Sequence, residues 1–253
     1  MTFFSSDSPS GYVAMQPAFS PLYQQICQSI LNSLQAGEWK PQQAIPSEME
    51  LAKRYNVSQG TVRKAIDELT AENLLVRRQG RGTFVATHQE PVNRFRFLRM
   101  QKKDDAEFKT YSSVLAVEAA VPPVEVRERL QMKPNQQATV ISRLLSFGDE
   151  PAVFEYIWLP KEIFPDVTMD KLVNYKGGLY GWFEAEYNVR MIRAVEHLSA
   201  HLASADVAQR LAVEPNSALL YIERVSYTYA EQPVEVRLGW YSTRHYHYRN
   251  ELI

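Results

Sequence analysis

The chain has 253 residues, of which 45% are hydrophobic and 23% charged, and this ordinary globular composition excludes a mainly disordered protein. A formal net charge of −1 excludes a protein that coats nucleic acid through bulk basic charge, and no run of about 18 uncharged apolar residues predicts a transmembrane helix. The first seventeen residues lack an export signal, and the single cysteine, Cys27, excludes an intramolecular disulfide. We expect a cytoplasmic protein without membrane attachment, in which any DNA affinity comes from a local basic patch.

The N-terminal part of the sequence predicts a first helix after an irregular start. Residues 1–17 are rich in Ser and Pro and lack periodicity, so we expect a flexible arm there. Apolar residues then recur at four-residue spacing from Leu22 to Leu34. This pattern predicts a helix with Ser20 as its N-cap and Gly37 just past its end.

Two further helices follow, joined by a short turn. Ser47 and Glu50 have the spacing of a reciprocal capping box, which predicts that a second helix runs from about Glu48 to Tyr55. Ser58 is placed to cap a third helix. Its apolar residues share one face, because they fall at positions i, i+3, i+4 and i+7: Val62, Ala65, Ile66 and Leu69.

A short basic hairpin is predicted directly after the third helix. The alternating segments LLVRR and TFVAT flank QGRG, a glycine turn. Three helices with a tight turn between the last two, followed by a hairpin, is the order of a winged helix-turn-helix. We place this DNA-binding domain at residues 18–87.

The same segment resembles the DNA-binding domain of the GntR family of bacterial transcription regulators. The motifs that carry the resemblance are PSE at 46–48, LA at 51–52, VS at 57–58, TVRKA at 61–65 and GRGTFV at 80–85. Met49 and Gln59 depart from the family, which often has arginine at both positions. Because both positions usually face DNA in the family, we expect a difference in operator sequence or affinity.

The third helix and the hairpin supply the predicted DNA contacts. With the apolar stripe turned inward, Arg63 lies on an outer arc that suits a major groove, and its forked donors fit a guanine edge or a phosphate. Arg81 stands between two glycines and suits a minor groove or a phosphate. The alternative interpretation is a solvated helix face. The full predicted set is Ser47, Glu48, Ser58, Gln59, Gly60, Thr61, Arg63, Lys64, Arg77, Arg78, Gly80, Arg81 and Gly82.

An interdomain linker is predicted at residues 88–110, where the sequence has no sustained period. From residue 74 to 103 the chain has eight arginines and lysines and one glutamate, a net charge of +7. The positive charge is therefore concentrated in the hairpin and the linker, as DNA binding requires.

The C-terminal part contains an internal repeat. Residues 129–143 match residues 210–224 at an offset of 81, and each unit continues through a strand and a Pro-ended turn to a second strand. Alternating segments such as VISRLLSF and VEVRLGWY predict antiparallel strands, and helices are expected at 124–130, 178–187 and 204–211. We therefore expect an α+β fold, in which helices cover one face of the sheet formed by residues 111–253.

This pattern resembles the UTRA effector-binding domain, which has a chorismate-lyase-like fold and defines the HutC-like branch of the GntR regulators. The resemblance implies that the pocket for a small-molecule effector is lined by Arg143, Gly178, Tyr180, Glu235 and Tyr241. Gly178 stands where sugar-phosphate-sensing members have serine, which argues against a phosphosugar. The free backbone amides at the N-terminus of the helix expected near Gly178 favour the binding of an anion.

Independently of the resemblance, two strand arginines are expected to need an anionic partner. Arg143 and Arg224 occupy equivalent positions in the repeat, each among apolar neighbours on its strand face. A buried guanidinium requires an anion, so each takes either an internal carboxylate or an acidic ligand. Glu155 and Glu235 are the candidate internal partners, and the two alternatives stay open. The predicted effector-binding residues are Arg143, Glu155, Gly178, Tyr180, Arg224, Glu235 and Tyr241.

Metal binding and catalysis are not expected. His197 and His201 lie in an alternating segment that predicts a strand, where four residues span ~13 Å and two side chains do not chelate one ion. His245 and His247 are interpreted as strand residues beside tyrosines, and Cys27 as core. No nucleophile, general base or metal-ligand spacing indicates an enzyme, and no cofactor is expected.

The sequence therefore predicts a transcription regulator, which we expect to be a repressor. It would act as a homodimer on a palindromic operator in double-stranded DNA and respond to a small acidic metabolite. The rival interpretations are a chorismate-lyase-like enzyme and a winged helix used for protein contact. The sequence identifies neither the effector nor the operator, and leaves open whether the effector weakens or strengthens DNA binding.

Overall fold

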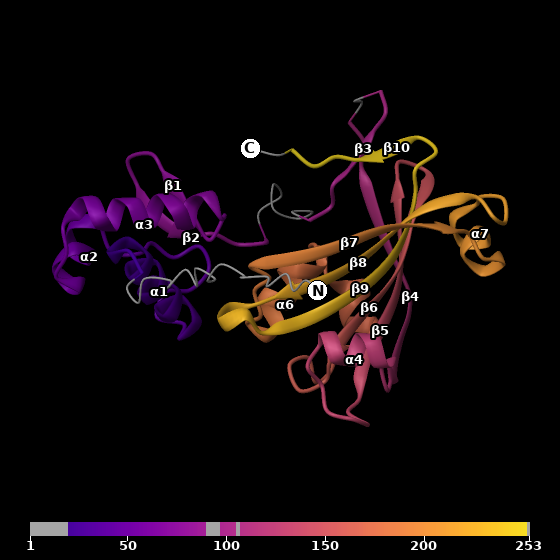
Figure 1. Ribbon diagram of the computed structural model, residues 1–253, viewed down its shortest axis with the longest axis horizontal. Coiled ribbons are helices and arrows are strands. Elements are labelled where there is room, and N and C mark those ends of the chain that lie inside the picture. The colour runs from indigo at the N-terminus through magenta and orange to yellow at the C-terminus, as the bar shows by residue number, and fades with distance from the viewer. Residues whose placement is uncertain (1–19, 90–96, 105–106, 252–253) are drawn as a thin grey trace, which may run out of the picture.

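The computed structural model describes residues 20–89, 97–104 and 107–251, so the predicted arm at 1–17 lies outside the described residues. The chain forms a small helical part that ends in a hairpin and a larger part built on one sheet (Figure 1). Within the described ranges, no helix has the length and apolar character needed to cross a bilayer.

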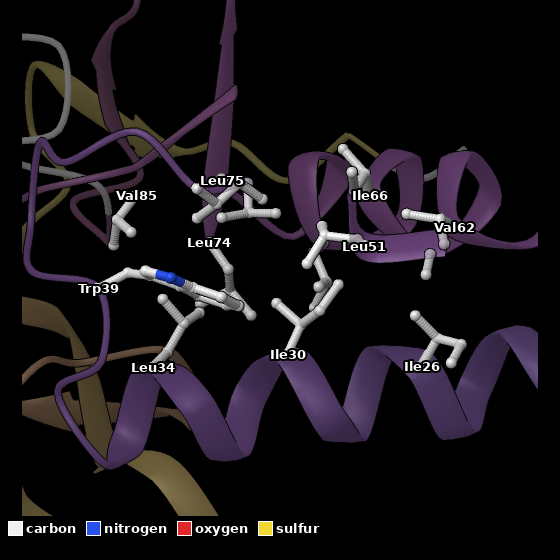
Figure 2. Packing of buried hydrophobic residues seen from close by; sticks show 13 residues of the cluster. Ile26, Ile30, Leu34, Trp39, Leu51, Val62, Ile66, Leu74, Leu75 and Val85 are labelled. Atoms are coloured by element: carbon white, nitrogen blue, oxygen red, sulfur yellow. The ribbon is translucent and has the colours of Figure 1, made fainter. Parts of the chain in front are cut away.

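The helical part consists of α1 (Leu22–Gln35), α2 (Glu48–Tyr55) and α3 (Gln59–Ala71). Figure 2 shows Ile26, Ile30 and Leu34 of α1 turned toward side chains of the other elements, with Trp39 closing one end. The predicted stripe of α3 is confirmed, since its four apolar residues are all buried. This single apolar cluster holds the three helices together.

Two of the three predicted helix N-caps are confirmed. The Ser47 amide donates to Glu50 Oε2 at 2.8 Å and Glu50 N donates to Ser47 Oγ at 3.3 Å, which confirms the capping box. Ser58 Oγ accepts from the amide of Thr61 and caps α3, as predicted. The prediction for Ser20 is wrong, because Pro21 occupies the N-cap of α1 and no side chain caps this end.

The hairpin, here called the wing, pairs β1 (Leu75–Arg78) with β2 (Gly82–Val85) in antiparallel register. Gly80 and Gly82 in the turn have φ of +69° and +105°, which L side chains rarely adopt. Ala44 forms a bridge with Phe84, so the loop before α2 continues the hairpin on its β2 side. The wing is therefore fixed to the helical core.

The larger part contains a six-stranded antiparallel sheet in the order β4-β5-β6-β9-β8-β7. Each repeat supplies three neighbouring strands, and the two units meet where β6 pairs with β9. Asn135 and Asn216, 81 residues apart, both have a positive φ, of 65° and 63°, which confirms the internal repeat in the backbone. The strands are β4 (Thr110–Ala120), β5 (Ala138–Phe147), β6 (Glu150–Pro160), β7 (Arg193–Leu202), β8 (Ala218–Tyr227) and β9 (Pro233–Ser242).

Helices cover both faces of this sheet, which corrects the expectation of a half-covered sheet. α5 (Met169–Asn174) and α6 (Leu179–Tyr187) pack in a cluster with Ile157 of β6. α7 (Ala205–Leu211) packs with Phe154, which alternation places on the opposite face, and α4 (Val124–Arg129) packs there with Val236. The repeat helices thus cover one face, and the segment between the repeats covers the other.

The segment expected to be a linker includes an unpredicted strand. β3 (Met100–Lys102) pairs with β10 (Tyr246–Tyr248) in a two-stranded sheet beside the larger part. His247 lies in β10, whereas His245 lies in an exposed bend before it and is not the strand residue we predicted. α5, β4 and the short helix η2 (Tyr229–Glu231) were also not predicted.

Candidate DNA-binding surface and effector pocket

The N-terminal half of α3 presents a polar surface opposite the apolar core. Gln59, Gly60 and Arg63 are exposed, and the Arg63 side chain keeps 56% of its surface accessible. The polar arc comes directly from the helical period, because the four apolar residues of α3 point the other way. A helix exposed in this way fits the major groove of DNA.

Glu48 at the start of α2 ties α3 to the wing. Its Oε2 accepts from Arg63 Nε at 2.9 Å, and its Oε1 accepts from Arg77 Nη2 of β1 at 3.1 Å. The hydrogen bond from Arg63 is the main cause that lowers the pKa of Glu48, so this carboxylate is charged at neutral pH. This one carboxylate therefore holds an arginine of α3 and an arginine of the wing beside each other.

The remaining basic residues of this surface differ in how firmly they are held. Arg81, at the tip of the wing, is exposed and makes no ion pair with any described residue. The Arg78 guanidinium stacks 4.7 Å from the centre of the Phe84 ring. Lys64 Nζ lies 3.9 Å from the centre of the Tyr23 ring, so it is held against α1. The tip arginine is therefore the cation least restrained by other protein groups.

Part of the predicted positive segment lies away from the wing. Lys102 belongs to β3, and Lys103 Nζ donates to the carbonyl of Arg244 at 3.1 Å, beside β10. Arg94 and Arg96 lie outside the described residues. In Figure 1, β3 and β10 lie beside the larger sheet and not beside α3. The basic surface of the helical part therefore depends on α3 and the wing.

A pocket in the larger part brings together five of the seven predicted effector residues. Arg143 on β5 and Glu155 on β6 are paired directly across the two strands, so their side chains share one face. Tyr180 on α6 covers that face. The pocket is lined by Phe97, Leu98, Arg143, Leu145, Glu155, Leu179, Tyr180, Arg224, Arg237 and Tyr241.

The other two predicted residues lie next to this pocket. Glu235 is completely buried behind it, where its Oε1 accepts from Tyr180 Oη at 2.9 Å and from Ser226 Oγ at 3.0 Å. Gly178, the N-cap of α6, lines an adjoining groove between β4 and the segment before α6. Arg143 and Leu179 line both the pocket and the groove, so the two spaces adjoin.

Internal carboxylates already neutralise the two strand arginines. Arg143 Nε donates to Glu155 Oε1 at 2.6 Å, which is the partner proposed from the sequence. Arg224 Nε donates to Glu196 Oε1 at 2.7 Å, so the expected partner Glu235 is wrong for Arg224. The difference arises because Glu196 on β7 is the cross-strand neighbour of Arg224, while β9 places Arg237 on its other side.

Arg237 is a pocket residue that sequence reasoning missed. It is buried, and its Nη2 donates to Glu235 Oε2 at 2.7 Å while its Nη1 donates to Glu155 Oε1 at 3.4 Å. The alternation of VEVRLGWY already placed it on the face of Glu235 and Tyr241, and that was the available signal. Glu196 and Phe97 were missed because cross-strand and interdomain neighbours leave no local pattern.

The electrostatics of the pocket depend on burial and on these pairs. Burial alone would raise the pKa of Glu155, but the charges of Arg143 and Arg237 outweigh it and hold that pKa below its ordinary value. Burial raises the pKa of Tyr180 and of Tyr241, so both phenols are neutral at physiological pH. The pocket therefore combines charged guanidinium and carboxylate groups with neutral hydroxyls.

Two of the histidines and the cysteine lie on regular elements of the fold. His197 and His201 lie on β7 as predicted, and His201 stacks on Tyr221 with the ring centres 4.2 Å apart. The described part of the chain has no cluster of three potential metal-ligating residues. Cys27 is half-buried against the helical core, where burial raises the pKa of its thiol to about 11.

Comparison with known proteins assigns both parts of the chain. Residues 22–85 match the family described as bacterial regulatory proteins, gntR family, and residues 105–247 match the UTRA domain. The chain belongs to the GntR family. Its C-terminal part is a UTRA domain, which is an effector-binding domain, and the chain is a transcriptional regulator with a mixed α+β fold.

Several relatives cover most of the chain. The HTH-type transcriptional regulator Rv0792c of Mycobacterium tuberculosis is 32% identical over an alignment of 205 residues, and the alignment covers 76% of this chain and 71% of the relative. The mannosyl-D-glycerate transport/metabolism system repressor MngR of Escherichia coli is 28% identical, covering 83% and 85%. The ligand-binding domain of a GntR-family regulator from Bordetella bronchiseptica is 40% identical with a TM-score of 0.61, covering 63% of this chain and 99% of that structure.

Proposed function

We propose that this GntR-family regulator is a homodimeric repressor that binds a palindromic operator in the cytoplasm, where bacterial DNA lies. Its α3 would enter the major groove, and the wing arginines would contact the minor groove or the phosphates. A small metabolite with an acidic group, bound beside Arg143, would lower operator affinity. Neither catalysis, a resident metal nor a cofactor is part of this proposal.

One observation supports the DNA-binding assignment most strongly: the carboxylate of Glu48 connects the exposed face of α3 to the wing. Glu48 fixes Arg63 and Arg77 relative to each other, so the helix and the hairpin present their cations as one surface. Fixed cations lose little side-chain freedom when they meet phosphates and bases. We therefore propose the residues predicted from the sequence as the DNA contacts, with Glu48 as their positioning residue.

The effector assignment is supported by the buried ionic groups around one pocket. Three arginines line it, and Arg143 also lines the adjoining groove. Such a group of buried ionisable residues in a concave site is the arrangement expected where a polar small molecule binds. The second candidate role for Arg143 is a permanent structural pair with Glu155, favoured by their 2.6 Å hydrogen bond.

Dimerisation is proposed to reside in the UTRA domain. The edge strand β7 is largely exposed, and Leu198 and Leu202 keep 45% and 66% of their surface accessible. An exposed edge strand with apolar residues is a template for pairing with a second copy. Sedimentation of the full chain at micromolar concentration should give a dimer, and a monomer would contradict this part of the proposal.

The decisive experiment selects an operator from random double-stranded DNA with the full chain and then compares Arg143→Ala with the unaltered protein. The variant should still dimerise and bind the selected operator, yet its operator affinity should no longer respond to a metabolite extract that releases the unaltered protein. If Arg143→Ala unfolds or loses operator binding without ligand, Arg143 belongs to a structural ion pair.

Salt titration of the mobility shift separates DNA binding from a protein-contact role, because phosphate contacts weaken steeply with salt.

A further inference from the structure

Two residues that line the effector pocket each have a buried polar atom without a hydrogen-bond partner among the described residues. Glu155 Oε2 and Arg237 Nε make no hydrogen bond with any described residue. Glu155 is 1% exposed and Arg237 is 6% exposed, and both line the pocket. Buried polar atoms in native proteins are almost always hydrogen-bonded, to protein groups or to ordered water, so an acceptor and a donor left over on two residues that line one cavity call for a polar partner there.

The two atoms belong to side chains that touch each other. Arg237 Nη1 donates to Glu155 Oε1 at 3.4 Å, while the other oxygen of Glu155 and the Nε of Arg237 stay unused. All three contacts that the Arg143 and Arg237 guanidinium groups make to Glu155 go to Oε1. A ligand that satisfies both atoms therefore needs a donor and an acceptor close together on one short skeleton.

The charges of the pocket are already balanced. Arg143 pairs with Glu155, Arg224 pairs with Glu196, and Arg237 pairs with both Glu155 and Glu235. Three guanidinium groups thus face three carboxylates. A ligand that carries only a negative charge would add an uncompensated charge in a buried site, which is costly. A ligand that carries one charge of each sign leaves the balance unchanged.

We infer that the effector is an amino-acid-type zwitterion, whose protonated amine donates to Glu155 Oε2 and whose carboxylate accepts from Arg237 Nε. This inference rests on the proposed effector pocket and narrows its ligand from an acid to an acid that also bears an amine. Glu155 and Arg237 lie on the paired strands β6 and β9, so the sheet holds both charged groups of the site in place. The remainder of the ligand extends past Arg143 and Leu179 into the adjoining groove, because those residues border both spaces.

The test uses the full chain and a matched set of compounds. The probes are the twenty common L-amino acids, β-alanine and 4-aminobutanoate, screened by thermal shift. Every compound that raises the unfolding temperature is compared by calorimetry with its analogue lacking the amine and its analogue lacking the carboxylate. We expect at least one zwitterion to bind, and to bind at least tenfold more tightly than either analogue, because a site built for a polar group rejects a ligand without it.

Two results would overturn the inference: binding by none of these zwitterions, or a single-charge analogue that binds within tenfold of its parent. Glu155→Gln should reduce the preference for the amine to less than tenfold, and a preference that stays tenfold overturns the assignment to Glu155. The matched control Glu223→Gln removes a carboxylate from the opposite face of β8 and should keep the preference. If Glu155→Gln does not fold, the analogue comparison on the unaltered chain still decides.

The outcome is separable from the proposed function. An acid without an amine that binds the pocket and changes operator affinity would overturn the zwitterion and leave the ligand-controlled repressor intact. If zwitterions bind but do not change operator affinity in a mobility shift, the inference of a zwitterionic ligand is kept. Control of operator binding by that ligand is then refuted.

Discussion

Thr87, just after the wing, donates its hydroxyl to Glu184 on α6 of the UTRA domain at 2.6 Å. The same Glu184 oxygen accepts from the amide of His88 at 3.0 Å. Tyr180 lies one helical turn earlier on α6 and contacts Glu235 behind the effector pocket. One short helix therefore joins the pocket to the DNA-binding domain, and it offers a physical route by which a ligand can favour one arrangement of the two domains.

A second contact between the domains lies beside the first. Arg190, also in the UTRA domain, is buried and donates to the carbonyls of Leu74 and Asn73 at 3.3 and 3.2 Å. These carbonyls lie between α3 and β1 of the winged helix. Because hydrogen bonds from a charged donor are stronger than neutral ones, we expect Arg190 to resist separation of the domains.

Thr87→Val should lower the free energy of unfolding by about 1–3 kcal/mol. The substitution keeps the size of the side chain but removes the hydroxyl that serves a buried carboxylate, and an unsatisfied buried acceptor costs this amount. Denaturant unfolding of the full chain measures the change. Ser112→Ala on the exposed part of β4 is the control and should change stability little. Equal stability of Thr87→Val and the unaltered chain would contradict a contribution from this contact.

Glu184 should make the stability of the chain depend on pH. Burial raises the pKa of Glu184 above its ordinary value, so the folded state holds a proton that the unfolded state has already released. Stability is therefore lost as pH rises from the unfolded pKa, about 4.3, through the folded pKa. Glu184→Gln removes this titration while keeping an oxygen for Thr87. Urea unfolding between about pH 4.5 and 7.5 should show the variant gaining stability relative to the unaltered chain as pH rises, and the opposite slope would refute the raised pKa.

Arg63→Ala should weaken specific operator binding about 5- to 150-fold while leaving the fold unchanged, because the side chain lies on the outer arc of α3. A mobility shift with the selected operator measures the affinity, and circular dichroism checks the fold. Lys133→Ala, an exposed cation on the UTRA domain, serves as the matched control and should leave affinity unchanged. Unaltered affinity in Arg63→Ala would remove this residue from the interface.

Arg81→Ala should flatten the salt dependence of DNA binding by about one unit of slope. A cation that replaces a counterion at a phosphate contributes about this much to the slope of log affinity against log salt. The measurement is operator affinity from about 50 to 200 mM salt, the range over which phosphate contacts weaken strongly. An identical slope in the variant would place Arg81 off the phosphate backbone, and Lys133→Ala again provides the control.

Local patterns in the sequence determined the winged helix and most strands of the UTRA domain. The capping box at Ser47 and Glu50 and the apolar stripe of α3 act between residues a few positions apart, so their geometry follows from the helical period alone. The start of α1 was misjudged by one residue, because Pro21 itself forms the N-cap and the helix begins at Leu22. The internal repeat could also be recognised in the sequence, because its two units have matching residues at a constant offset of 81.

Only the tertiary structure decided the partners of the buried charges. Alternation and the repeat placed Arg143 and Arg224 on equivalent strand faces, but the strand order decided that Arg224 meets Glu196 on β7 and that Arg237 lies between Glu155 and Glu235. The strand order is set by pairing between segments far apart in the sequence, and no local period encodes it. The same holds for the contact of Thr87 with Glu184, which joins residues 97 positions apart. Two domains must fold and dock before that hydrogen bond exists, so the route from pocket to DNA belongs to the tertiary structure.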